Sequence, residues 1–244
     1  MKRIGKYFIF LGSLFVRRES FKTYFDLTME ECVQIGINSI LLVALVSTFM
    51  GAVTTIQTAY NLVNPFIPMY IISTVVRDMV ILELAPTIIA IIYAGKVGSS
   101  MASGLGTMRI TEQIDALEVM GINSASYLVL PKIIASLLMY PLLVILAGLL
   151  SMLGGYLAGT LGDIISPTEY NYGLQYTFNE FTVKFALIKS VAFAFLISSI
   201  SSYMGYYTTG GALEVGKSST NAVTQSVIAV LCADYLLAEL LLKV

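Results

Sequence analysis

The sequence contains no histidine and no tryptophan, and it has only two cysteines and few charged residues. Without histidine, the chain lacks the commonest general acid–base group and the commonest metal ligand of proteins. Cys32 and Cys232 have no metal-ligand spacing, and we expect both to be buried, unpaired thiols. Charged residues make up 12% of the chain, about half the share of a soluble domain, and the net charge of −1 argues against a nucleic-acid partner. We therefore expect no metal site and no catalytic site.

Long apolar runs are the main feature that is present, since hydrophobic residues form 57% of the chain. Several runs are long enough to cross a bilayer. They predict an all-α integral membrane protein, one permease-like transmembrane domain over residues 1–244 with about five spans. The spans are expected at 33–55, 80–102, 127–159, 185–207 and 220–242. A helix over 127–159 would be about 50 Å long, so it must begin outside the bilayer core, tilt, or bend at Pro131 or Pro141.

The N-terminal segment 1–25 has a basic start, a short apolar stretch at 7–16, and then Arg17 and Arg18 in place of a signal cleavage site. This stretch is too short to span, and it predicts an interfacial helix on the inner leaflet. With five spans and the N-terminus inside, ten of the 14 Lys and Arg residues lie on the inner side. We therefore expect a cytoplasmic N-terminus, a periplasmic C-terminus, a cytoplasmic region at 104–126 and a periplasmic loop at 161–180.

The stretch 111–121 predicts a short amphipathic helix between spans two and three. We expect Thr111 to cap its start and Gly121 to end it. At about 100° per residue, Ile114, Leu117 and Met120 form an apolar stripe, and Glu112, Asp115 and Glu118 lie opposite. An acidic face disfavours an anionic lipid surface. Two interpretations stay open, packing on the chain's own bundle or docking into the groove of a partner.

Four charged residues, Glu83, Lys96, Lys189 and Asp234, fall within or near the apolar spans. Such residues usually face a cavity or a charged partner, because exposure to lipid is costly. One interpretation is an ion pair between Lys189 and Asp234. In the alternative, Lys189 extends to the interface and Asp234 accepts from backbone or hydroxyl donors.

Glu83 also has two interpretations, a polar group at the mouth of a lipid-accepting cavity or a carboxylate that caps the start of span two. Candidates for the apolar lining of that cavity are Leu41, Leu45, Phe49, Ile56 and Tyr70, with ordinary helix packing as the alternative. Glycines at 148, 154, 155 and 159 form small-residue stripes that permit close contact between helices.

Residues 211–218, GALEVGKS, satisfy the phosphate-loop pattern G-x-x-x-x-G-K-[ST]. That pattern needs a preceding strand in an α/β domain, and here an apolar span precedes it. We therefore interpret the match as chance. Gly210, Gly211 and Gly216 are expected to shape a loop at 208–219 between spans four and five.

Residues 83–132 closely resemble the core of the MlaE-type (YrbE-like) ABC transporter permease family, the membrane subunits of MCE-associated lipid transporters. Later stretches at 187–193 and 210–223 also resemble that family. Leu82 and Gly104 stand where the family usually has Arg and Glu, and Lys96 and Lys217 replace arginines. The matching positions are Glu83, Leu84, Pro86, Ala94, Gly95, Gly98, 105–108, 111–117, Met120, Gly121 and Pro131.

The resemblance implies that the helix at 111–121 couples the chain to an ATPase, with Thr111, Glu112, Ile114, Asp115, Leu117, Glu118 and Met120 as docking residues. It implies a phospholipid substrate in a bacterial inner membrane. The implied partners are a second copy of the chain, a cytoplasmic ABC ATPase dimer that holds ATP–Mg, and a periplasmic MCE-domain protein; this chain itself would bind no cofactor. Two other functions stay open: a secondary transporter with Lys189, Asp234 and Glu83 as a charge relay, and a non-transporting scaffold.

Overall fold

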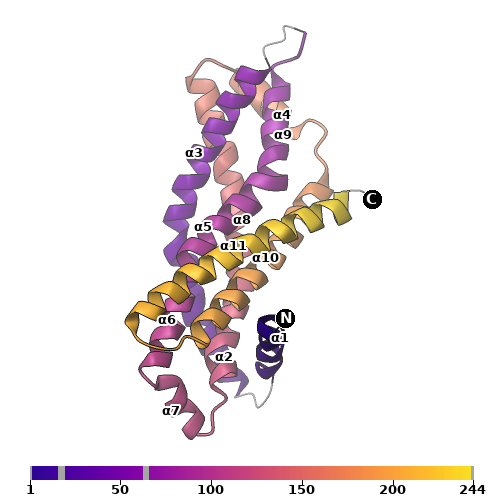
Figure 1. The fold of residues 1–244 in the computed structure, drawn as a ribbon. Coiled ribbons are helices and arrows are strands. Elements are labelled where there is room, and N and C mark those ends of the chain that lie inside the picture. The colour runs from indigo at the N-terminus through magenta and orange to yellow at the C-terminus, as the bar shows by residue number, and fades with distance from the viewer. Residues whose placement is uncertain (1, 16–19, 63–65, 243–244) are drawn as a thin grey trace. The chain divides into compact units, whose positions relative to one another are not determined.

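The computed structural model describes residues 2–15, 20–62 and 66–242, and every regular element in these ranges is a helix (Figure 1). Arg17, Arg18 and Lys243, which entered the charge count, lie outside the described residues. The elements are α1 (Lys2–Ser13), α2 (Phe21–Cys32), η1 (Val33–Ile37), α3 (Asn38–Asn61), α4 (Tyr70–Met79), η2 (Val80–Ile88), α5 (Ile89–Tyr93), η3 (Ala94–Gly98), α6 (Ser99–Ile110), α7 (Gln113–Val119), α8 (Ser124–Leu161), α9 (Pro167–Gln175), α10 (Glu180–Tyr206) and α11 (Ala212–Leu242), where η marks a π-helix.

Four helices in the described part of the chain are long and apolar enough to cross a membrane. They are Phe21–Asn61, Ser124–Leu161, Glu180–Tyr206 and Ala212–Leu241, and they contain most of the predicted first, third, fourth and fifth spans. The chain is therefore an all-helical, multi-pass membrane protein. Helix α8 has 38 residues and is uninterrupted at Pro131 and Pro141. At about 57 Å it is longer than the bilayer core is thick.

The predicted second span falls in a run of five consecutive helical segments from Tyr70 to Ile110. The longest of these segments, α6, has 12 residues, because the π-helices η2 and η3 divide the run. Pro86 lies inside η2 and cannot donate a backbone hydrogen bond, which favours a departure from the α-helical pattern. The fifth crossing stays a prediction.

Contacts divide the chain into two compact units. The first unit contains Met1–Asn38, Ala90–Tyr140 and Val191–Val244, and the second contains Ser39–Ile89 and Pro141–Ser190. In the first unit, α6 packs against α11, and Phe10 of α1 and Leu14, which follows α1, join a buried cluster around Leu105. The single permease domain stays a prediction.

Helices α3 and α8 approach closely within the second unit. A Cβ atom added to Gly51 would lie 1.8 Å from the carbonyl oxygen of Ser151, and one added to Gly154 would lie 2.0 Å from that of Thr48. Only glycine allows the two backbones to come this near. Of the predicted small-residue positions, Gly154, Gly155 and Gly159 are close contacts, whereas Gly148 has nothing within 4 Å.

The predicted loop 161–180 contains the helix α9, which is a correction. Ser166 caps its start in a capping box with Glu169, and Pro167 occupies the first turn. Helix α9 packs against α4. Its Gly173 lies so near α4 that an added Cβ would be 2.1 Å from the carbonyl oxygen of Tyr70.

Arg77 of α4 holds the C-terminal end of α9 and is only 3% exposed. Its Nη1 donates to the carbonyl oxygens of Leu174, at 2.9 Å, and Tyr176, at 2.8 Å. Its guanidinium also pairs with Asp78 and lies 5.5 Å from the centre of the Phe178 ring. A cation is well placed here because the end of a helix presents carbonyl groups that have no partner within the helix.

Three further expectations need correction. The segment 1–25 holds α1 and the start of α2 as separate helices. Both cysteines are free, as predicted, but only Cys32 is buried and Cys232 is exposed. The loop expected at 208–219 is shorter, because α11 already begins at Ala212.

Candidate functional site

A left-handed residue joins α6 to α7. Glu112 has φ 60° and ψ 14°, a conformation that side chains other than glycine seldom adopt. Thr111 does not cap α7, which corrects the prediction. It is the C-cap of α6, and its hydroxyl donates to the carbonyl oxygen of Thr107 at 2.8 Å. The helix of the preceding segment continues to Ile110, so this threonine follows one helix instead of opening the next.

Gly121 ends α7, as predicted, with φ 82°. The N–H of Gly121 donates to the carbonyl of Glu118 at 3.0 Å, and the N–H of Ile122 donates to that of Leu117 at 3.1 Å. These two bonds form a Schellman motif, which satisfies carbonyl groups at the end of the helix.

The predicted apolar stripe of α7 does not face a single neighbour. Ile114 is fully buried within the chain itself, whereas Leu117 is half-buried and Met120 is 66% exposed. Val119, which the sequence reasoning did not select, is 88% exposed. Val119 and Met120 are therefore the apolar side chains that α7 offers to a partner, and Ile114 instead anchors the helix to the first unit.

The acidic residues of α7 tie it to three other helices of the first unit. Asp115 pairs with Arg109 of α6 at 2.7 Å. Glu118 accepts hydrogen bonds from the hydroxyls of Ser124, at 2.9 Å, and Tyr206, at 3.1 Å. Ser124 opens α8 and Tyr206 closes α10, and both helices are candidate membrane spans. Helix α7 is thus hydrogen-bonded to the ends of two candidate spans.

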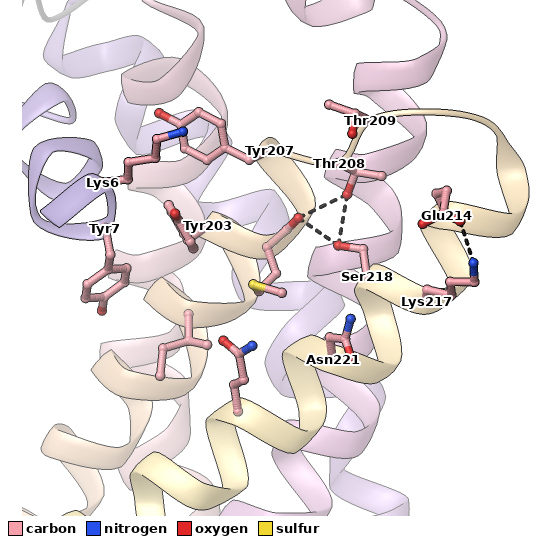
Figure 2. A pocket seen from close by; sticks show the side chains of 13 residues that line it. Lys6, Tyr7, Tyr203, Tyr207, Thr208, Thr209, Glu214, Lys217, Ser218 and Asn221 are labelled. Atoms are coloured by element: carbon pink, nitrogen blue, oxygen red, sulfur yellow. Dashed lines mark hydrogen bonds and ion pairs between the residues drawn. The ribbon is translucent and has the colours of Figure 1, made fainter. Parts of the chain in front are cut away.

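Residues 212–218 of the phosphate-loop pattern lie in α11, so the strand and loop that the pattern needs are not found here, and the interpretation as a chance match stays a prediction. Within α11, Lys217 pairs with Glu214 at 2.6 Å, and Ser218 bonds to Thr208 at 2.9 Å (Figure 2). These contacts leave no loop of backbone N–H groups around a phosphate. Gly210, with φ 111°, shapes the turn as expected, but Gly216 lies inside α11 and does not.

Lys189 of α10 is fully buried in the second unit. Its ammonium donates to Glu83 at 2.7 Å and to the carbonyl oxygen of Leu82 at 3.1 Å, and it lies 5.0 Å from the centre of the Phe185 ring. In an α-helical register the N–H of residue 86 would bond to that carbonyl, and Pro86 has no N–H. Lys189 therefore satisfies a carbonyl that the proline cannot, and it neutralises the carboxylate beside it.

The interpretation of Glu83 as a cap is wrong, because Glu83 lies inside η2 and the helical run begins at Tyr70. The pair between Lys189 and Asp234 stays a prediction, because these residues belong to different units. Asp234 is half-buried.

A small cavity lies beside Lys96, away from the position at Glu83 where a lipid-accepting cavity was predicted. It has a volume of about 280 Å³ and lies in the first unit, where Lys96, Lys132 and Glu31 contribute to its lining. Lys132 pairs with Glu31, and Lys96 donates to the carbonyl of Asn38 at the end of η1.

The candidate lipid-contacting residues of α3 lie on its exposed face. Leu41, Leu45, Phe49 and Ile56 are 49–73% exposed. Tyr70 of α4 is instead half-buried, with its ring 5.1 Å from that of Tyr172 and 5.0 Å from that of Tyr176. A role of these residues in a lipid cavity stays a prediction.

No group of three or more metal-ligating side chains occurs among the described residues. The two candidate functional features are the tethered helix α7 in the first unit and the buried Lys189 in the second.

Comparison with known proteins gives a consistent result. The family model described as "Permease MlaE" matches residues 28–240. A "Probable ABC transporter permease protein" of Rickettsia bellii is 38% identical over 242 residues, which cover 99% of this chain and 93% of the relative. A protein of the same description from Synechocystis is 34% identical over 220 residues, covering 88% and 82%. The chloroplastic protein TRIGALACTOSYLDIACYLGLYCEROL 1 of Arabidopsis thaliana is 33% identical over 237 residues, covering 95% and 66%.

Proposed function

We propose that this chain, which belongs to the MlaE permease family, is the permease subunit of an ABC-type phospholipid transporter. The resemblance noted in the sequence is thereby confirmed at the level of the family. ABC transporter permeases work with an ATPase, and in this proposal a separate cytoplasmic ATPase dimer binds ATP–Mg and supplies the energy. The permease contributes binding and movement and no covalent chemistry.

The tethering of α7 is the observation that carries this proposal. Val119 and Met120 are exposed at its end, and Glu118 is bonded to Ser124 and Tyr206. An ATPase groove that holds the two exposed apolar side chains would move Glu118 with them. The hydrogen bonds of Glu118 would then displace the ends of α8 and α10, a small shift of the kind that switches packed helices between two arrangements.

The lipid substrate is supported by two further observations. The exposed face of α3 is apolar at Leu41, Leu45 and Phe49, which suits acyl chains. One of the relatives is named after a galactolipid, trigalactosyldiacylglycerol. We propose that the chain forms a homodimer in the bacterial inner membrane, with its N-terminus cytoplasmic and its C-terminus periplasmic. It would move phospholipid between that membrane and a periplasmic MCE-domain carrier.

The ion pair between the buried Lys189 and the exposed Glu83 favours a second candidate, a secondary transporter driven by an ion gradient. Intramembrane charges often carry ions or protons in such proteins. Lipid transport that continues after nucleotide depletion would support this candidate, and transport that stops would exclude it. A scaffold without transport activity predicts no transport under either condition.

Replacement of the exposed end of α7 tests the docking. The double variant Val119→Asp/Met120→Asp should insert into the membrane and lose the co-purifying ATPase, because two carboxylates cannot enter an apolar groove. The matched control is Leu161→Asp at the end of α8, where the side chain is 82% exposed. A full complement of ATPase in the double variant would contradict the proposal.

A further inference from the structure

A cavity of about 780 Å³ lies in the first unit between α1, the end of α10 and the start of α11 (Figure 2). Figure 2 shows Lys6 and Tyr7 on one side and Glu214, Lys217 and Asn221 on the other, with Tyr203 of α10 and Tyr207, which follows it, nearer to Lys6 and Tyr7. The volume is within the range of about 300–1,000 Å³ that is usual for small-molecule sites. Neither the docking of α7 nor the ion pair of Lys189 uses this cavity.

The lining carries a net positive charge. Lys6 and Lys217 contribute two ammonium groups, and Glu214 is the one acidic residue that lines the cavity. Because Glu214 pairs with Lys217, Lys6 keeps its charge available, and Lys217 has two further N–H donors. The amide side chains of Asn221 and Gln225 add neutral donors.

Three tyrosines line the same cavity, namely Tyr7, Tyr203 and Tyr207. The rings of Tyr7 and Tyr203 pack edge to face at 5.5 Å. Burial raises the pKa of Tyr207, so its phenol is neutral near pH 7 and able to donate a hydrogen bond. Tyrosines concentrate where a membrane span meets the water, at the level of the lipid headgroups.

The neighbouring helices place the cavity at that same level. The candidate span of α10 ends at Tyr206, and that of α11 begins at Ala212. On α1, Phe8 and Ile9 are 65% and 73% exposed next to Lys6, as in a helix that lies in the interface with its apolar side toward acyl chains. On α11, Ile228 is 56% exposed beyond Gln225.

We infer that this cavity binds the phosphate group of a membrane phospholipid. Lys6 and Lys217 supply the positive charge of the site from its opposite sides, the amides of Asn221 and Gln225 and the phenol of Tyr207 offer hydrogen-bond donors, and the acyl chains lie along the exposed apolar side chains of α1 and α11. The apolar surroundings favour a lipid phosphate over free phosphate. A part played by this lipid in transport rests on the proposed function, whereas its binding does not.

Lipid titration of the purified full chain tests the site. In detergent, the chain is titrated with dioleoylphosphatidylglycerol, and bound lipid is counted by native mass spectrometry. The double variant Lys6→Gln/Lys217→Gln should bind at least about tenfold more weakly, roughly the worth of one charge-assisted hydrogen bond. The matched control is Lys22→Gln/Lys184→Gln, which removes two exposed lysines that do not line the cavity. Lys6→Arg/Lys217→Arg should retain the lipid.

Two competitors identify the ligand. Dioleoylglycerol, which lacks the phosphate, should bind weakly and equally to wild type and to the Gln double variant. Inorganic phosphate should not displace the phospholipid. Equal weakening in the control variant, lysine-dependent binding of dioleoylglycerol, or displacement by inorganic phosphate would each overturn the inference. The titration contains neither ATPase nor nucleotide, so its failure is distinct from a failure of ATPase docking.

Discussion

The ammonium of Lys189 lies 2.7 Å from Oε2 of Glu83, although the two residues are 106 positions apart in the chain. The same ammonium donates to the carbonyl of Leu82, and the hydroxyl of Thr87 donates to Glu83 at 3.2 Å. One buried cation therefore joins α10 to the π-helix η2 and satisfies two acceptors around Pro86. The pair holds together a part of the second unit where the regular helix pattern is interrupted.

Removal of this cation should destabilise the protein. Lys189→Met removes the ammonium that donates to both Glu83 and the carbonyl of Leu82, and we expect a loss of about 1–3 kcal/mol in the free energy of unfolding. Glu83→Gln should cost less, since the amide oxygen can still accept. The thermal midpoint in detergent and a double-mutant cycle measure the coupling. A double variant whose loss equals the sum of the single losses would refute the pairing.

The stability of Asp234 variants tests whether Lys189 also interacts with Asp234. If Asp234 also pairs with Lys189, then Lys189→Met should remove most of the effect of Asp234→Asn. The stability of the double variant should then be close to that of Lys189→Met alone. Fully additive losses in the double variant would contradict the interaction.

The close approach of α3 and α8 makes glycine necessary at one position and dispensable at another on the same helix. Gly154→Ala should destabilise the protein by about 2–3 kcal/mol, because its Cβ would lie 2.0 Å from the carbonyl oxygen of Thr48. Gly148→Ala is the control, since nothing lies within 4 Å of its Cβ. It should be neutral or stabilising by up to about 1 kcal/mol, the helix-propensity difference. Equal effects on the thermal midpoint would argue against the contact.

Arg77 should determine whether α9 stays folded against α4. Arg77→Met removes both bonds to the carbonyls of Leu174 and Tyr176, with an expected loss of about 2–4 kcal/mol. Arg77→Lys should recover only part of it, because an ammonium lacks the planar fork of a guanidinium. Limited proteolysis between residues 161 and 180 should be faster in the Met variant. Unchanged cleavage would show that α9 does not depend on this residue.

Glu118 should affect the transmission of movement from α7 to α8 and α10, and it should not affect the docking of α7 to the ATPase. Glu118→Ala removes both hydrogen bonds from α7 to Ser124 and Tyr206, at about 1 kcal/mol each. We expect the ATPase to be retained and ATP-driven lipid transport to fall about tenfold. Glu118→Gln keeps an acceptor and should remain near wild type. Loss of the ATPase in Glu118→Ala, or full transport, would contradict a role in transmission.

The parts of the fold that could be predicted are those that depend on local properties of the chain. Four candidate spans follow from apolar length alone. The polar composition of 161–180 predicts a loop, whereas the residues Ser166, Pro167 and Glu169 within it form a recognisable start signal for the helix α9. Thr111 was misplaced for a related reason. In the sequence, a threonine that follows a helix cannot be distinguished from a threonine that begins one unless the end of the preceding helix is known.

The contacts between distant segments could not be predicted. Periodicity identified an apolar side of α7, but it could not show that Ile114 is covered by the chain's own first unit. The partner of Lys189 depends on which helices are neighbours, and two acidic residues, Glu83 and Asp234, lie within or near the predicted spans. Arg77 had no local signal at all, since its acceptors lie about a hundred residues further along.

The two left-handed residues that bracket α7, Glu112 and Gly121, fix the length of this short helix as well as its direction. One inserted or deleted residue between them would rotate Met120 by about 100° relative to Ile114. Met120 could then no longer be exposed while Ile114 stays buried in the first unit. If α7 docks into an ATPase as proposed, substitutions of Val119 and Met120 could adapt the permease to a different ATPase, whereas an insertion or deletion within α7 would abolish docking to any ATPase.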